Sequence, residues 1–189
     1  QVFELEHLMS MGKKNIIPVL LYLFHQIENR LDGRPTLVVL EEAWLLLSHS
    51  AFSDKLEDWL RTLRKKNAAV VLVTQSLSEI AKAKQGDLIV ESCPTKIFLP
   101  NPEASTPHNS RLYGELGLTK RQIEIIAQAV PKREYYYVSP LGKRLIDLTL
   151  GPLALRFVGA GSQEDILRAK GLMKKHGEHW AAHWTRRSQ

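Results

Sequence analysis

Two adjacent carboxylates, Glu41 and Glu42, directly follow the apolar stretch Thr36–Leu40. The sequence TLVVL predicts a buried strand, and ligands of an open parallel sheet bind at the carboxyl ends of its strands. One carboxylate there can hold Mg²⁺, directly or through water, while its neighbour orients or deprotonates an attacking water. The pair therefore indicates nucleotide hydrolysis. The alternative is that two exposed acids simply begin a helix, where the helix dipole favours them.

A second apolar stretch, Ala68–Val73, also ends in polar residues. Its sequence AAVVLV predicts another buried strand, and Thr74 and Gln75 follow it. A neutral amide at the tip of a neighbouring strand can bond the terminal phosphate or the attacking water. Gln75 is therefore a candidate catalytic residue, and ordinary helix capping is the alternative.

Four basic side chains gather just before this second strand, namely Arg61, Arg64, Lys65 and Lys66. They end a predicted helix over 52–66, where the helix dipole favours cations. The planar guanidinium of an arginine suits a transferring phosphoryl group, in the same subunit or in the next one. The alternative is a solvated helix face, which must hold for at least two of the four.

The elements that would position these groups alternate along the first hundred residues. Helix, strand, helix, strand, helix, strand is the order typical of a parallel α/β sheet with helices on both faces. The predicted helices span 16–31, 52–66, a segment ending near residue 83, and 87–91. The predicted strands are Thr36–Leu40, Ala68–Val73 and Thr95–Leu99, each nearly continuously apolar.

The second half of the chain predicts a β-hairpin followed by helices. The expected elements are a polar loop over 105–110, a helix over 119–129, strands over 134–138 and 144–150, and helices over 162–175 and 176–185. Residues 139–142, with the sequence SPLG, are expected to form the hairpin turn. Gly151 and Pro152 are expected to end the second strand of the hairpin. We expect the chain to divide into residues 1–161 and a basic helical tail, 162–189.

Several blocks of sequence, taken together and in order, resemble one known family. The blocks are PTLVVLEEAW, WLRTLRKKNAAVVLVTQSLSEI, TKIFLPNPEA, YGELGLTKRQIEII and PKREYYYVSP, within residues 3–161. They resemble the C-terminal ATPase domain of the conjugal-transfer and type IV secretion ATPases, which include TrbE and CagE. The resemblance implies an α/β fold, a RecA-like P-loop NTPase core with a parallel sheet flanked by helices, plus a C-terminal β-hairpin and helices. It also implies ATP hydrolysis that drives assembly of a secretion apparatus or transfer of its substrate.

The resemblance assigns roles to the acids and to the amide. Glu41 takes the Mg²⁺-side position of the Walker B element, holding the ion through water once nucleotide is bound. Glu42 takes the catalytic position, and Gln75 matches the sensor glutamine. The family usually has Asp at the first acid, so the longer Glu41 would shift the metal by about one methylene.

The resemblance also covers three basic residues. Arg64, as a catalytic residue, and Lys65, as a nucleotide-binding residue, match the basic motif that lies between the two strands. Arg133 matches the arginine of a later KRE motif, where it would contact a second phosphate or a neighbouring subunit.

A phosphate-binding loop of the form Gly-x-x-x-x-Gly-Lys-Ser/Thr does not occur in the 189 residues. Its backbone N–H groups and its lysine cradle the phosphates of a nucleotide, and the family places it upstream of the Walker B strand. We therefore expect a C-terminal fragment that carries the Walker B half of the site. ATP and Mg²⁺ would be cofactors of the full-length protein, whereas the fragment would bind neither and would be inactive.

Composition and resemblance together describe the expected setting. No run of eighteen apolar residues occurs, and the single Cys93 cannot form an internal disulfide. From the pattern of residues 1–12 we expect no secretion signal. The net charge of +6 permits contact with nucleic acid or an anionic membrane surface without demanding either. The resemblance implies a hexameric or other ring on the cytoplasmic face of a bacterial inner membrane, with other type IV secretion proteins as partners. Direct contact with DNA stays open.

Other features allow further interpretations. Residues 118–126 resemble the start of a helix-turn-helix motif, which would need a recognition helix next, but a strand is predicted there. The C-terminal segment that holds His176, His179 and His183 could bind a metal, since His179 and His183 are spaced i, i+4. The alternatives are that Trp180 and Trp184 pack on the domain or on a partner, or that the basic tail touches a membrane surface or a neighbouring subunit. Two other functions stay open for the whole chain. One is a non-catalytic docking or DNA-binding module of a secretion apparatus, and the other is a DNA-pumping ATPase of the coupling-protein or FtsK-like class.

Overall fold

Two parallel strands form the first sheet of the computed structural model, which describes residues 2–3, 13–41, 50–83 and 86–185. Strand β1 (Thr36–Leu40) pairs with β2 (Ala68–Leu72), from Thr36 opposite Ala68 to Leu40 opposite Leu72. The Val73 N–H donates to the Leu40 carbonyl at 2.9 Å and extends the ladder by one bond. The two apolar strands predicted from the sequence are confirmed, and they share one direction as a β-α-β connection requires.

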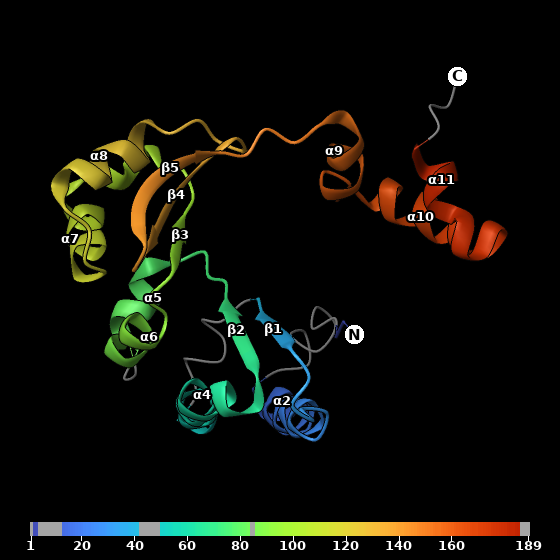
Figure 1. The fold of residues 1–189 in the computed structure, drawn as a ribbon, viewed down its shortest axis with the longest axis horizontal. Helices are drawn as coiled ribbons and strands as arrows, with labels where there is room; N and C mark the ends of the chain where they lie inside the picture. Colours follow the sequence, from blue (N-terminus) through green and yellow to red (C-terminus); the bar gives the residue numbers. More distant parts are fainter. Residues whose placement is uncertain (1, 4–12, 42–49, 84–85, 186–189) are drawn as a thin grey trace.

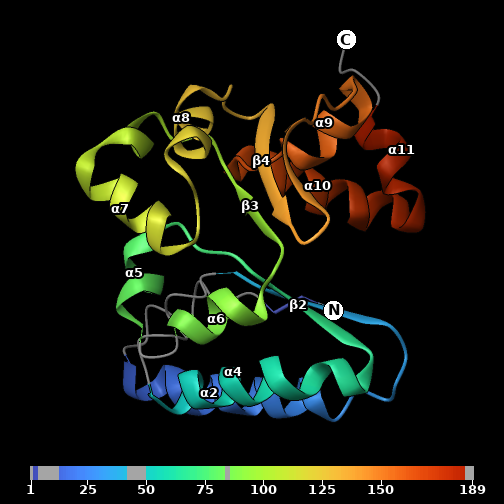
Figure 2. The ribbon, with the colours of Figure 1, turned by 60° about the vertical axis from the view of Figure 1, so that its left-hand side comes forward.

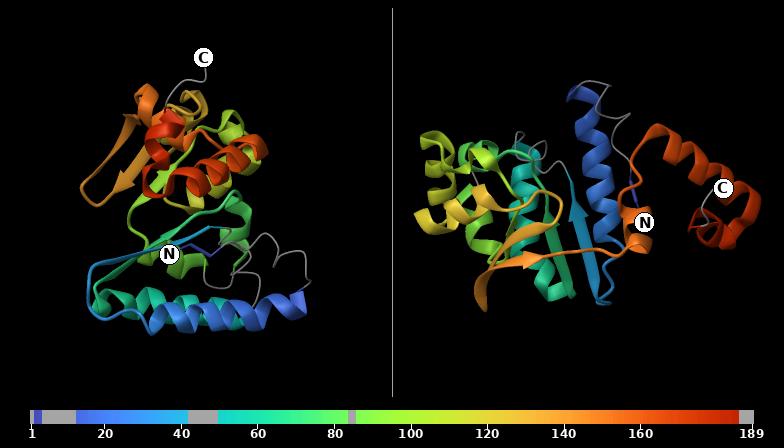
Figure 3. Two further views of the ribbon diagram at one scale, coloured as in Figure 1. Left: turned by 90° about the vertical axis from the view of Figure 1, so that its right-hand side faces the viewer. Right: turned by 90° about the horizontal axis from the view of Figure 1, so that it is seen from above.

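Two helices cover one face of this sheet, and Figure 3 shows them side by side. They are α2 (Lys13–Glu28) and α4 (Ser50–Thr62), which packs Trp59, 0% exposed, against Phe24 with ring centroids 4.4 Å apart. The inward residue Val38 of β1 belongs to the same core. The opposite face of the strands exposes apolar side chains to solvent: Leu37, Val39, Val71 and Val73.

The second sheet is antiparallel, with the order β3 (Lys96–Phe98), β4 (Glu134–Ser139) and β5 (Gly142–Asp147). The β4–β5 hairpin is confirmed. The expectation that the third strand joins the parallel sheet is wrong, because β3 pairs antiparallel with β4. Phe98 lies opposite Tyr136, and both enter a core with Ile126. The apolar run predicted a strand, but it could not reveal which strand would be its neighbour.

Short helices connect the two sheets and cover the second one (Figures 1 and 2). They are α5 (Leu77–Lys82), α6 (Gly86–Ser92), the 3-10 turn η2 (Pro102–Ser105), α7 (Pro107–Glu115) and α8 (Lys120–Gln128). The polar loop expected over 105–110 is wrong, because Pro107 occupies the first turn of α7, where a missing N–H costs little. Helix α8 begins with a capping box, in which the Thr119 N–H donates to Gln122 Oε1 at 2.8 Å.

The C-terminal helices stand apart from both sheets in Figure 1. They are α9 (Pro152–Val158), α10 (Gln163–His176), the turn η3 (Gly177–His179) and α11 (Trp180–Thr185). The strand run ends before Gly151 and Pro152 as expected, and Pro152 then begins α9, a helix that was not predicted. Trp184 Nε1 donates to the Arg156 carbonyl at 2.8 Å, which ties α11 to α9. The division of the chain at residue 161 stays a prediction.

Candidate functional site

The carboxyl edge of the parallel pair carries the candidate nucleotide site. Glu41 directly follows β1 and is exposed, and Gln75 comes three residues after the end of β2. Because Leu40 lies opposite Leu72, both residues belong to the same edge of the sheet. Glu42 lies outside the described residues, so its placement rests on the sequence alone. The structure therefore brings an acid and an amide, Glu41 and Gln75, to one edge.

The predicted basic residues lie at the other edge. Arg64 and Lys65 belong to the 3-10 turn η1 (Leu63–Lys66), which immediately precedes β2, and both are exposed. A five-residue strand spans about 16 Å, so β2 separates them from Gln75 by roughly that length. The structure therefore does not bring Arg64 and Lys65 together with Glu41 within this chain.

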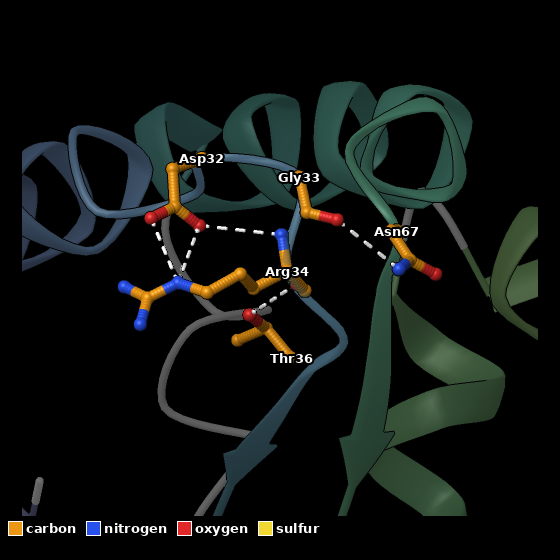
Figure 4. Close-up of polar contacts among 5 residues, drawn as sticks. All are labelled: Asp32, Gly33, Arg34, Thr36 and Asn67. Atoms are coloured by element: carbon orange, nitrogen blue, oxygen red, sulfur yellow. Dashed lines mark hydrogen bonds and ion pairs between the residues drawn. The ribbon is translucent and has the colours of Figure 1, made fainter.

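Hydrogen bonds hold the end of η1 against the turn before β1 (Figure 4). Asn67 adopts a left-handed conformation, φ 56°, and its Nδ2 donates to the Gly33 carbonyl at 3.1 Å. In the same turn, Arg34 Nε lies 2.8 Å from Asp32 Oδ2. Hydrogen bonds from Arg34 hold the pKa of Asp32 below its ordinary value. Because asparagine tolerates positive φ, η1 can turn sharply into β2 and present its basic side chains at this edge.

Arg133 lies in neither place, because it precedes β4 in the second sheet. Its Nη2 and Nε atoms lie 2.6 Å and 2.9 Å from Asp147 Oδ2 on β5. Hydrogen bonds from Arg133 and then Thr149 lower the pKa of Asp147. A phosphate that binds Arg133 would therefore compete with an ion pair across the hairpin.

The remaining candidate side chains show ordinary packing. The rings of His176 and His183 stack with centroids 3.6 Å apart. No group of three or more His, Cys, Asp or Glu side chains suited to a metal ion is found among the described residues. Burial raises the pKa of the Cys93 thiol, which keeps it in the less reactive protonated form. Tyr136 is buried at 4% exposure and its two tyrosine neighbours are half-buried, as the alternation along a strand predicts.

A turn at the carboxyl edge, held by the Thr74 hydroxyl, was not predicted from the sequence. Thr74 Oγ1 lies 3.2 Å from the Ser76 backbone nitrogen and 3.3 Å from the Ser76 carbonyl oxygen. The signal was available, because serine and threonine hydroxyls bond to the backbone two residues on in turns of this kind. Nearby, Glu79 Oε2 of α5 is buried and has no hydrogen-bond partner among the residues that the structure describes.

Comparison with known proteins relates the chain to proteins of conjugation and secretion. It is 53% identical over 184 residues to the conjugal transfer protein TrbE of Rhizobium radiobacter. It is 52% identical over 184 residues to a probable conjugal transfer protein TrbE of Sinorhizobium fredii. Both matches cover 97% of this chain, which spans only 22% and 28% of those two proteins. The type IV secretion system protein virB4 of Bartonella quintana is 32% identical over 68% of this chain and 16% of its own length.

A solved structure supports the same relationship at the level of the fold. The structure of VirB4 of Thermoanaerobacter pseudethanolicus superposes with a TM-score of 0.57 at 19% identity, covering 71% of this chain and 36% of that one. No family model matches the chain. Within the described residues, no helix is long and apolar enough to cross a membrane. Because more than half of its residues match TrbE over nearly its whole length, the chain belongs to the TrbE and VirB4 family of conjugal transfer and type IV secretion proteins.

Proposed function

We propose that this chain carries the Walker B half of an ATPase that energises conjugative DNA transfer or type IV secretion. The observation that carries the proposal is the placement of Glu41 and Gln75 at one carboxyl edge of a parallel strand pair. In this role Glu41 would hold Mg²⁺ through water, Glu42 would activate the attacking water, and Gln75 would bond the terminal phosphate. ATP and Mg²⁺ would be cofactors of the full-length protein.

The exposed sheet face supports a site completed by other parts of a longer protein. Leu37 and Val39 of β1 are 63% and 51% exposed, and Val71 of β2 is 42% exposed. Parallel sheets of this kind are normally covered on both faces. A covering segment that also brings the phosphate-binding loop would bury these side chains. The 189 residues alone should then neither bind ATP tightly nor hydrolyse it.

ATP hydrolysis by the full-length protein tests the proposal. We expect Mg²⁺-dependent hydrolysis that Glu42→Gln reduces by about 10²-fold or more, since the substitution removes the base and keeps the shape. Glu57→Gln is the matched control, because Glu57 lies on α4 and pairs with the exposed Arg61 at 3.0 Å. An active Glu42→Gln protein, or a Mg²⁺-dependent rate from the 189 residues alone, would contradict the proposal.

The opposite edge suggests that the basic turn acts on a neighbouring subunit. Since Arg64 lies about one strand length from Gln75, it would reach the phosphates bound by the next copy in a ring. Lys65 would join it there, and Arg133 is proposed for a second phosphate or for the subunit boundary. These roles require that the protein form a ring of identical copies in which each site spans two of them.

Mixing two inactive variants distinguishes action across the boundary from action within one chain. In rings that mix Glu42→Gln and Arg64→Ala subunits equally, about one site in four would combine an intact Glu42 with a neighbour's intact Arg64. Activity should therefore reappear on mixing if Arg64 acts on the next subunit. If Arg64 acts within its own chain, the mixture stays as inactive as its components.

We further propose partners and location from the family relationship. The ring would work with other type IV secretion proteins at the inner membrane of a bacterium, on its cytoplasmic side.

The C-terminal helices favour a docking role as a second function of the chain. They stand apart from the sheets, and Leu153, Val158 and Leu167 on them are 63–69% exposed. Pull-down of the other secretion proteins with and without residues 152–189 would test this role.

A further inference from the structure

The segment between β2 and α5 is held by side-chain hydroxyls. The last ladder bond of β2 runs from Val73 N–H to the Leu40 carbonyl at 2.9 Å. Helix α5 begins only at Leu77. Gln75 therefore lies between two regular elements, after the last ladder bond of the strand and before the first residue of the helix.

The Thr74 hydroxyl spans this gap. Its Oγ1 accepts a hydrogen bond from the Ser76 N–H at 3.2 Å and donates one to the Ser76 carbonyl at 3.3 Å. Both contacts reach across Gln75, so they close a small ring that contains its backbone. Thr74 is half-buried, which limits competition from water for these bonds.

Ser76 does not supply this bracing itself. Although it precedes α5 as the N-cap residue, its side chain makes no capping hydrogen bond. The Ser76 Oγ lies instead 2.9 Å from Ser78 Oγ. The Thr74 hydroxyl therefore supplies a side-chain acceptor for the Ser76 N–H, just before the first turn of α5.

We propose that Thr74 is a positioning residue for Gln75, holding its backbone at the carboxyl edge so that the amide meets the terminal phosphate. The inference rests on the proposed function, since it gives Thr74 a role only through the sensor glutamine. Preorganised hydrogen-bonding groups contribute most when their position is fixed before the reaction. A hydroxyl that fixes the backbone of a sensor residue should therefore affect turnover more than nucleotide binding.

Steady-state ATP hydrolysis by the full-length protein tests this role. Valine matches threonine in shape but lacks the hydroxyl, so Thr74→Val should lower kcat by about 10-fold and leave KM for ATP within about twofold. Thr74→Ser keeps the hydroxyl and should restore most of the rate. Thr62→Val is the matched control, because the Thr62 hydroxyl bonds to the Asp58 carbonyl on α4, away from this edge.

A double-mutant cycle separates positioning from a general loss of structure. If Thr74 acts only through Gln75, adding Thr74→Val to Gln75→Ala should cause no further loss of kcat. Multiplicative losses in the double variant, or a Thr74→Ser protein as slow as Thr74→Val, would overturn the inference. If Gln75→Ala itself retains the full rate, the proposed function fails. If Gln75→Ala is slow but Thr74→Val is not, only the role of Thr74 fails.

Discussion

The buried contact between α2 and α4 gives the sharpest stability prediction. Glu28 Oε1 lies 2.6 Å from Trp59 Nε1 and 2.6 Å from Lys55 Nζ. Trp59 is 0% exposed, so its indole N–H has no access to water. Replacing Glu28 with alanine would leave this donor buried and unpaired, and would also leave Lys55 without its carboxylate.

The magnitude follows from the two lost contacts. A hydrogen bond to a charged group contributes about 1.5–3 kcal/mol, and a buried donor left unpaired costs a similar amount. The contact with Lys55 adds less than about 1 kcal/mol, because its side chain is 32% exposed. We therefore expect Glu28→Ala to lower the free energy of unfolding by about 2–3 kcal/mol. Glu57→Ala, on the helix α4 that also carries Trp59, removes only an exposed pair and should cost about 0.5 kcal/mol or less.

Urea unfolding followed by tryptophan fluorescence measures the difference between these two variants. Trp59→Phe should reduce the cost of Glu28→Ala, since the unpaired donor is then gone. Equal midpoints for Glu28→Ala and Glu57→Ala, at the same slope, would refute the reasoning. So would a Glu28→Ala cost that is unchanged in the Trp59→Phe background.

Three further outcomes are expected. Burial raises the pKa of Glu28, but hydrogen bonds from its neighbours outweigh this and hold the pKa below the ordinary 4.5. The stability that ionised Glu28 contributes is therefore complete above about pH 4.5 and is lost as pH falls through the lower pKa of the folded state. In Glu28→Gln, the free energy of unfolding measured in urea should therefore fall less steeply as the pH is lowered. A methyl group on Gly86 would lie 2.4 Å from the Ile80 carbonyl oxygen, so Gly86→Ala should lower the free energy of urea unfolding by about 1–3 kcal/mol. A methyl group on Gly171, inside α10, would extend into open space, so Gly171→Ala should stabilise the fold by about 0.5–1 kcal/mol. A higher thermal midpoint of unfolding would show this gain.

One part of the candidate site could be predicted from the sequence, namely the residues whose place follows from the direction of the strands. Two apolar strands that a helical connection joins run parallel, so the residues after each strand share an edge. Glu41 and Gln75 come to one edge for this reason, and the register of the two strands agrees. The same connectivity also determines the position of Arg64, because this residue directly precedes β2 and must lie at the amino edge. This position was not predicted from the sequence.

The strand that pairs with β3 could not be predicted from the sequence. Its apolar residues fit either a parallel or an antiparallel neighbour, and the choice depends on Phe98 meeting the distant Tyr136. The helix α7 was missed for a local reason, because Pro107 suggests a loop unless it occupies the first turn of a helix. The bracing of Gln75 by Thr74 was visible as a threonine two residues before a serine, but many such pairs make no bond.

The sequence by itself determined where the strands and most helices lie, and which edge holds Glu41 and Gln75. These features depend on the period of apolar residues and on chain connectivity, which are local properties. Tertiary structure decided that the described strands divide into two sheets, that Arg133 pairs with Asp147, and that one sheet face stays exposed. Each of these depends on contacts between distant segments, whose choice is set by packing and by competing partners that no short stretch of sequence contains.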